Sequence, residues 1–277
     1  MAPTTITILP ADQAPLTITT TSAAYGAPFN LSASGGSDEG AVSYLLDSPG
    51  SAGCSLSGSL LSFTGVGACT VTATMAGDAD YDPVSSQPTT IAVEPGAQAP
   101  LAITSTSGTY GSPLSLSTSG GSDTGAVSYL LDSPGSAGCS LEGGGSKLVS
   151  TTTGSCTLTA TMAGDADYDP VSSPPTVVTF SPAQTTTVLK LSRALLRLGH
   201  EGAGVLTVTV SATGATPEGT VRIAGTTCLI TLVEGRGSCR LARSALKAGV
   251  HHLVASYSGS NDFASSTSTA RRLVVRR

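Results

Sequence analysis

The sequence predicts an all-β chain of three β-sandwich domains in tandem, and three observations lead to this prediction. The block Gly40–Leu56 recurs unchanged at Gly125–Leu141, and Thr72–Ser86 recurs at Thr159–Ser173. With 33 Gly, 16 Pro, no Trp and 11% charged residues, the composition lacks the runs that long helices need. Short stretches of alternating apolar residues take their place. A repeat of about 85 residues indicates an array of small domains and not one catalytic core.

The repeated blocks also predict the domain boundaries. Pro88–Gln98 and Pro175–Gln184 end two full repeats, and Pro3–Gln13 has the same form with no repeat before it. Four segments follow from this: the remnant of a preceding repeat (1–13), the first repeat (14–98), the second repeat (99–184) and a divergent C-terminal domain (185–277).

We expect from this organisation either that the chain is a monomeric fragment of a longer protein, whose upstream part could hold an export signal, or that a terminal repeat has been lost. Met1–Gln13 has neither a basic region nor an apolar region of the kind that opens a signal peptide. No run of about 18 apolar residues is present, so no membrane insertion is expected.

Each repeat carries about seven strand signals, spaced roughly 8 to 12 residues apart. In Cys69–Met75 every second residue is apolar and the others are Thr, so one face packs in a core while the other meets water. Four more stretches of the first repeat alternate in this way: Leu16/Ile18, Phe29/Leu31/Ala33, Val42/Tyr44/Leu46 and Ile91/Val93. This pattern describes a sandwich of the immunoglobulin type. A propeller would need about four or more blades of roughly 40 to 50 residues.

The C-terminal domain does not copy the repeats, but it ends in the same way. Val254–Phe263 matches Thr72–Tyr81: a strand, a Gly two residues later, and an aromatic residue four further on. We expect the Gly to permit a special backbone conformation and the aromatic ring to close the end of the sandwich. Arg193–Leu198 is either a short helical turn or an extra edge segment. The expected strands are Thr186–Ser192, Val205–Ser211, Gly219–Ala224, Thr227–Val233, Gly237–Leu241, Val250–Tyr257 and Thr269–Val275.

Six cysteines fall two to a domain, which predicts three disulfides within domains. The expected pairs are Cys54 with Cys69, Cys139 with Cys156, and Cys228 with Cys239. Closing a loop of about 15 residues would stabilise each domain by roughly 3 kcal/mol. Pairs of reduced core thiols are the alternative, and no C-x-x-C motif suggests a metal. Disulfides imply an oxidising, extracellular or cell-surface location.

Three segments resemble the bacterial Ig-like repeat domains of large secreted and surface proteins. They are Leu101–Leu114, the Gly-Asp-Ala-Asp-Tyr stretches, and Gly249–Ser266; the C-terminal domain is closest to the type with the strand Thr216–Val221. The resemblance covers nearly the whole chain. It implies a stalk, spacer or adhesive module of a surface protein, and it implies no catalytic residues, because this family has none in common.

Charge divides the chain sharply. Up to Gln184 there are 14 acidic residues and one basic residue, a net charge of −13, whereas from Thr185 on there are 12 basic and four acidic residues, a net +8. Such a basic end could bind a cell-wall polymer, an acidic glycan, a lipid surface or a host surface protein. Specific nucleic-acid binding is not expected, because no exposed aromatics interleave with the cations. Scattered, solvated charges are the alternative. The candidate polyanion-binding residues are Arg271, Arg272, Arg276 and Arg277.

Two acidic loops are candidates for calcium. Each carries carboxylates at three alternate positions, the ligand type that a hard cation prefers: Asp78, Asp80 and Asp82, and in the copy Asp165, Asp167 and Asp169. The EF-hand pattern of Gly and Glu does not follow them. The other interpretation is that these residues form turns, as Asp commonly does after Gly.

No enzyme is expected. The sequence has no G-x-S-x-G, no H-E-x-x-H and no phosphate-binding loop. His251 and His252 are neighbours on a predicted strand and so point to opposite faces. We therefore expect a non-catalytic stalk or spacer of an extracellular bacterial surface protein. The alternatives are a carbohydrate- or wall-binding module acting through the C-terminal domain, and an accessory domain of a hydrolase.

Overall fold

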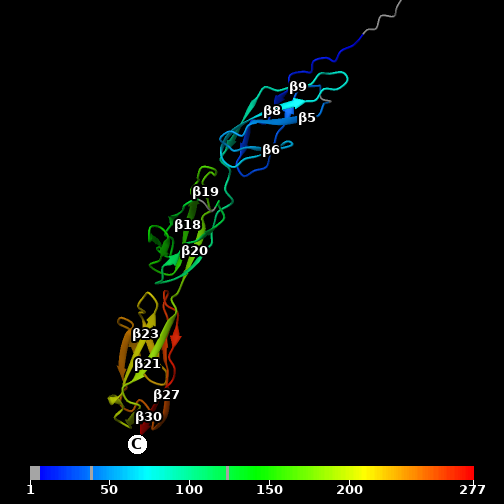
Figure 1. Ribbon diagram of the computed structural model, residues 1–277. Helices are drawn as coiled ribbons and strands as arrows, with labels where there is room; N and C mark the ends of the chain where they lie inside the picture. The colour runs from blue at the N-terminus through cyan, green and yellow to red at the C-terminus, as the bar shows by residue number, and fades with distance from the viewer. Residues whose placement is uncertain (1–6, 38–39, 123–124) are drawn as a thin grey trace, which may run out of the picture. The chain divides into compact units, whose positions relative to one another are not determined.

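A computed structural model describes residues 7–37, 40–122 and 125–277 (Figure 1). Its regular structure consists of β-strands and one short 3-10 turn, η1 (Glu201–Ala203), so the all-β prediction is confirmed. Within these ranges no helix has the length and apolarity to cross a membrane. Residues 1–6 of the expected preceding strand lie outside the described residues. In the part that is described, Ala11 forms an isolated bridge with Tyr81.

The first repeat folds into two layers. Each strand sequence is short, and turns rich in Gly separate the strands. One layer has the strand order β2–β10–β8–β5, with β9 added on β8: β2 (Ser22–Ala24), β10 (Thr89–Glu94), β8 (Gly67–Met75), β5 (Val42–Ser48) and β9 (Val84–Ser85). The other layer contains a three-stranded sheet and a strand pair: β3 (Phe29–Asn30), β7 (Leu60–Ser62) and β6 (Ser55–Ser57), then β1 (Thr17–Ile18) and β4 (Ala33–Ser34).

The alternation in β8 builds the core as the sequence predicts. Cys69, Val71, Ala73 and Met75 are buried, and the Thr residues between them are only half-buried. They pack with apolar residues of both layers, such as Leu31, Leu61 and Ile91. Val42 differs from the prediction and is 38% exposed, because β5 is the last strand in the sheet order.

The second repeat reproduces this plan strand for strand. Its strands are β11 (Ala102–Ile103), β12 (Ser107–Thr109), β13 (Leu114–Ser115), β14 (Thr118–Ser119), β15 (Val127–Ser133), β16 (Ser140–Glu142), β17 (Lys147–Val149), β18 (Gly154–Met162), β19 (Val171–Ser172) and β20 (Thr176–Ser181). The sheet order β12–β20–β18–β15 matches that of the first repeat. The extra residues lie at the tip of the β16–β17 hairpin, where Gly143, Gly144 and Gly145 all have positive φ.

The C-terminal domain contains three sheets. Their strand orders are β21–β23–β26, β22–β30–β27 and β25–β24–β28–β29. The strands are β21 (Thr185–Leu191), β22 (Leu195–Arg197), β23 (Val205–Ala212), β24 (Thr220–Ile223), β25 (Leu229–Thr231), β26 (Arg236–Arg240), β27 (Gly249–Leu253), β28 (Ala255–Tyr257), β29 (Ser266–Thr267) and β30 (Arg271–Arg276).

Two details of this domain refine the sequence prediction. Arg193–Leu198 contains an edge strand, β22, which runs parallel to β30, and not a helical turn. The single strand expected over Val250–Tyr257 is interrupted at Val254. Its first part, β27, pairs with β30, while its second part, β28, pairs with β24 and β29.

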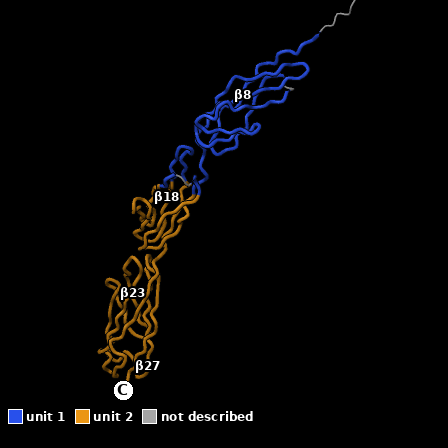
Figure 2. The backbone as a smooth tube through the Cα atoms, viewed as in Figure 1, with its two compact units in different colours: residues 1–101, 120–127, 161–172 blue, residues 102–119, 128–160, 173–277 orange. Residues whose placement is uncertain are grey.

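By spatial contacts the chain divides into two compact units (Figure 2). One unit contains Met1–Leu101, Gly120–Val127 and Thr161–Ser172. The other contains Ala102–Ser119, Ser128–Ala160 and Ser173–Arg277. Because this division cuts through the second repeat, the boundaries of three separate domains stay a prediction.

All six cysteines are paired as the sequence predicts, which excludes the reduced-thiol alternative. The Cα atoms lie 6.2 Å apart in Cys54–Cys69, 6.2 Å in Cys139–Cys156 and 6.0 Å in Cys228–Cys239. In the first repeat the bond joins the residue before β6 to β8, so it connects the two layers of the sandwich.

Candidate functional site

The linker between the two repeats is held by the loop that follows β18. Gly96, in the predicted linker Glu94–Ala99, donates its N–H to the Asp167 carbonyl (2.9 Å) and accepts from the Asp169 N–H (2.9 Å). The ring of Tyr168 packs edge-on against Tyr25 of the first repeat, with centroids 5.3 Å apart and planes at 78°. All these residues belong to one compact unit. The loop therefore joins the linker and the first sandwich.

A carboxylate completes this joint. Asp167 Oδ1 accepts a hydrogen bond from the backbone N–H of Val66 at 2.9 Å, and both residues are partly buried. Val66 precedes β8 of the first repeat. Such a charge-assisted bond is stronger than one between neutral groups. The joint thus has three parts: a bridged linker residue, an aromatic pair and a carboxylate that binds a backbone N–H.

The same three parts recur where the second repeat meets the C-terminal domain, within the other compact unit. Ala183 donates to the Asp262 carbonyl and accepts from the Ala264 N–H, both at 2.9 Å. Phe263 packs edge-on against Tyr110, with centroids 5.5 Å apart. Asp262 Oδ1 accepts from the Thr153 N–H and from Thr152 Oγ1, each at 2.7 Å. The joint is thus kept although the C-terminal domain has a different sequence.

These contacts correct the expected role of the aromatic residues. Tyr168 and Phe263 do not only close their own sandwich: each ring contacts a Tyr of the preceding one. The Gly before them also acts differently from expectation in the repeats. Gly77 has no positive φ, but a Cβ there would lie 2.7 Å from the Tyr81 carbonyl oxygen. Close approach of the backbone therefore requires Gly at this position.

The six aspartates proposed for calcium have other contacts in the structure. Asp78 Oδ1 accepts from the N–H groups of Asp80 and Tyr81 at 2.8 and 2.9 Å, and Asp165 Oδ1 makes the same turn in the copy. The backbone N–H of Asp82 donates to Ala11. Over the described ranges, no three acidic, His or Cys side chains are grouped as a metal ion would require. Calcium binding stays a prediction, and turn formation accounts for the residues that start each loop.

The four candidate arginines lie in and just after β30, and their common binding of a polyanion stays a prediction. Arg271 donates through Nε to the Leu189 carbonyl at 3.0 Å. Arg272 and Arg276 are exposed and lie four residues apart on β30, and Arg277 follows the end of that strand. A shallow groove of about 480 Å³ brings Lys190 together with Arg271 and Arg272. Sequence reasoning missed Lys190, because only the pairing of strands places it near the end of the chain.

Glu201 is a second residue that the sequence did not single out. It is fully buried in η1, and its carboxylate accepts from the Gly199 N–H (3.1 Å, Oε1) and the Ser244 N–H (2.8 Å, Oε2). The bond from Ser244 is the main cause that lowers the pKa of Glu201, and burial opposes it. Ser244 has a positive φ of 59°, so Glu201 fixes an unusual backbone segment. No local pattern reveals a partner 43 residues away.

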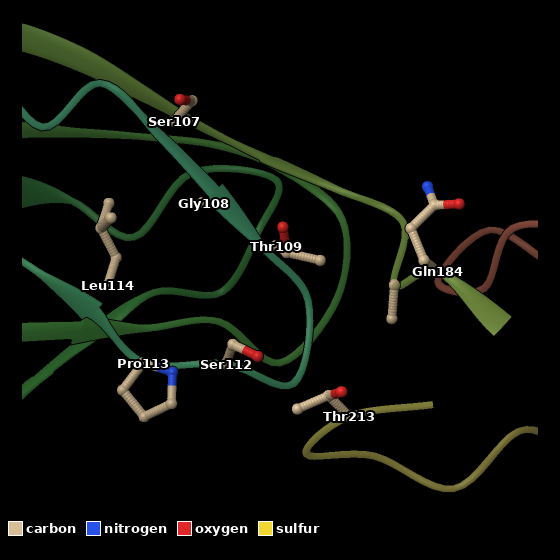
Figure 3. Close-up of a pocket in the computed structure, with 9 residues that line it drawn as sticks. Ser107, Gly108, Thr109, Ser112, Pro113, Leu114, Gln184 and Thr213 are labelled. Carbon is tan, nitrogen blue, oxygen red and sulfur yellow. The ribbon is translucent and has the colours of Figure 1, made fainter. Parts of the chain in front are cut away.

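A pocket of about 440 Å³ opens beside the second joint (Figure 3). Thr109, Ser112 and Gln184 come from the second repeat, while Thr213 comes from the C-terminal domain. Its other lining residues are Ser107, Gly108, Pro113, Leu114 and Ala183. None of these side chains is a carboxylate, imidazole, thiol or amine. The pocket therefore offers hydroxyl and amide groups, and its lining residues include no side chain of the kind that would activate a hydroxyl as a general base.

Comparison with known proteins identifies one part of the chain. Residues 197–276 match the family of bacterial Ig-like domains (group 3). No curated protein matches the sequence. Among solved structures, the FdeC adhesin of Escherichia coli is 13% identical, with 98% of this chain and 100% of that chain covered and a TM-score of 0.29. The S-layer protein rSbsC is 12% identical, with 95% and 40% covered and a TM-score of 0.33. Similarities of this size carry no argument about function.

The sheets, the paired cysteines and the family match agree with one another. Two near-identical β-sandwich repeats precede a third sandwich of different sequence, and a disulfide closes each of the three. The protein is thus a tandem β-sandwich chain, and its residues 197–276 match the model of the bacterial Ig-like domains (group 3).

Proposed function

We propose that this chain is a non-catalytic structural spacer of an extracellular bacterial surface protein. The observation that carries the proposal is the repeated joint, with its bridged linker residue, aromatic pair and partly buried carboxylate contact. A flexible tether needs none of these contacts. A spacer needs them, because its length depends on each domain keeping its orientation to the next.

The magnitudes agree with a joint that stays closed. An aromatic pair contributes about 0.5 to 1.5 kcal/mol beyond its buried area. A hydrogen bond to a charged group contributes roughly 1.5 to 3 kcal/mol, and less where water reaches it. Together these exceed RT several times over. The disulfides support the extracellular part of the proposal, since such bonds persist in oxidising compartments.

Backbone ¹⁵N relaxation of the full chain tests this function. If the joints are closed, amides of the first repeat, the second repeat and the C-terminal domain report one common tumbling time. Replacing Asp167 and Asp262 by Ala should give each sandwich its own, shorter time. Asp47→Ala, on an exposed strand of the first repeat, is the matched control. Independent tumbling in the unaltered protein would rule out a stiff spacer.

A second candidate function is adhesion through the C-terminal domain, to a wall polymer, a glycan or a host surface protein. The observation that favours it is the groove lined by Lys190, Arg271 and Arg272. These three cations line one groove, and no ion pair neutralises them within the described ranges. The accessory-domain alternative has no specific contact in its favour.

A further inference from the structure

We propose that one sheet face of the C-terminal domain binds a linear acidic polysaccharide. This basic face is the outer side of β22, β30 and β27, the side that carries Arg197, Arg272 and Arg276. The proposal rests on the second candidate function, adhesion through this domain, and it names the site and the class of ligand. It is independent of the spacer function.

Strand register places four side chains of this face in two pairs, and three of the four are arginines. In the antiparallel pairing of β27 with β30, His252 lies opposite Arg272, and in the parallel pairing of β22 with β30, Arg197 lies beside Arg276. Side chains at paired positions share a face of the sheet. Alternate residues on the other face are buried in the core: Leu196, Leu273 and Val275. The cations therefore point to solvent.

An aliphatic row lies between the two pairs. Val274 is in register with Leu195 on one side and with Val250 on the other. Leu195 is 49% exposed and Val250 is 52% exposed. Arg272 and Arg276 are four residues apart, which is about 13 Å along a strand, and three strands span about 10 Å. The basic face is therefore a narrow strip with charge at both ends and an apolar middle.

No acidic side chain interrupts this strip. Of the four acidic residues after Thr185, Glu201 is buried against backbone N–H groups and Asp262 belongs to the joint. Glu218 and Glu234 lie outside β22, β27 and β30. In the described part of the chain, no ion pair engages Arg197, Arg272 or Arg276. Arg272 also lines the groove that contains Lys190 and Arg271.

The shape and chemistry of the strip indicate its ligand. Guanidinium groups bind carboxylate and sulfate groups through paired N–H donors. An acidic polysaccharide carries such groups at intervals along one chain, and the C–H faces of its sugar rings are suited to an aliphatic row. A bilayer presents charged groups over a whole plane, and a strip about 10 Å wide would contact only a few of them. Nucleic acid would find no Phe, Tyr or Trp side chain on this face for base stacking.

The test measures binding of the full chain to two immobilised acidic polysaccharides, chondroitin sulfate and polygalacturonate. Neutral dextran serves as the uncharged polymer, and phosphatidylglycerol vesicles serve as the anionic lipid surface. The site variant is Arg272→Gln with Arg276→Gln. Its matched control is Arg236→Gln with Arg243→Gln, which removes the same charge from β26 and the loop after it; β26 belongs to another sheet, β21–β23–β26. Val250→Ser probes the aliphatic row. Thermal unfolding checks that every variant is folded.

We expect binding to both acidic polymers at 150 mM salt and none to dextran. The site variant should weaken this binding by about tenfold or more, whereas the control should change it by about twofold, since distant charges are screened. Val250→Ser should weaken it by a few fold. Equal losses in the two double variants would overturn the basic face while leaving adhesion standing. Binding to vesicles alone would overturn the ligand class, and no binding to any probe would overturn both the face and the adhesive function.

Discussion

Replacing Asp262 by Ala should open the second joint without unfolding either sandwich. The carboxylate of Asp262 is the acceptor for two donors of the second repeat, the N–H of Thr153 and the hydroxyl of Thr152, both at 2.7 Å. The bridge between Ala183 and the loop uses backbone atoms only, so the substitution leaves it in place. The change therefore removes one part of the joint and spares the rest.

The size of the effect follows from the two bonds. A hydrogen bond to a charged acceptor contributes roughly 1.5 to 3 kcal/mol in a protected site, and partial exposure of Asp262 reduces this to about 1 kcal/mol for each. A loss of about 2 kcal/mol corresponds to about thirtyfold in an opening equilibrium. Because the Thr153 N–H donates to Asp262, its hydrogen exchange reports that opening directly.

Hydrogen exchange of the full chain is the assay. We expect the Thr153 amide to exchange about thirtyfold faster in Asp262→Ala and by a smaller factor in Asp262→Asn, which keeps a neutral acceptor. The Val66 amide, held by Asp167 in the first joint, is the internal control and should not change. Unchanged exchange at Thr153, or an equal rise at Val66, would refute the reasoning.

Three further predictions concern the C-terminal domain. Because the pKa of Glu201 is lowered in the folded state, its contribution to stability is present above the ordinary pKa of 4.5 and is lost as pH falls through the folded value. In Glu201→Gln the midpoint of urea unfolding should therefore fall less with decreasing pH than in the unaltered protein. An equal fall in the two proteins would contradict this. Replacing Cys228 and Cys239 by Ala should lower the free energy of unfolding by about 3 kcal/mol, since the bond closes an 11-residue separation, and a loss below about 1 kcal/mol would contradict the loop-entropy argument. Gly259→Ala should lower the free energy of unfolding in urea more than Gly225→Ala does. Both glycines have positive φ, but only at Gly259 would a Cβ lie 2.7 Å from a carbonyl oxygen. Equal losses of stability would contradict a role for this close contact.

The sandwich cores could be predicted because their signal is local. Alternation along Cys69–Met75 fixes which side chains turn inward, whatever strand lies beside them. The interruption at Val254 could not be predicted, because it depends on a change of partner from β30 to β24. Pairing partners are distant in sequence, and no periodicity records them.

The candidate sites show the same limit. Asp167 and Asp262 accept hydrogen bonds from backbone N–H groups of a neighbouring sandwich. The sequence suggested only calcium binding or a turn for Asp167 and did not single out Asp262, because the partners of both residues are distant in sequence. Arg271 and Arg272 are adjacent in sequence, yet the two-residue period of a strand sends them to opposite faces. The sequence therefore identified the basic end of the chain without resolving the face on which its charges meet.

The parallel pairing of an early strand with the last strand has a mechanical consequence. β2 pairs with β10, β12 with β20 and β22 with β30, all in parallel. Traction on the two ends of such a sandwich slides these strands past each other, so their hydrogen bonds resist together and do not open one by one. Rupture under load is governed by the rate of unfolding and not by its equilibrium. When a sandwich unfolds under force, its disulfide keeps the segment between the two cysteines closed as a loop. That segment cannot extend, so each unfolding event lengthens the chain by less than it would without the disulfide.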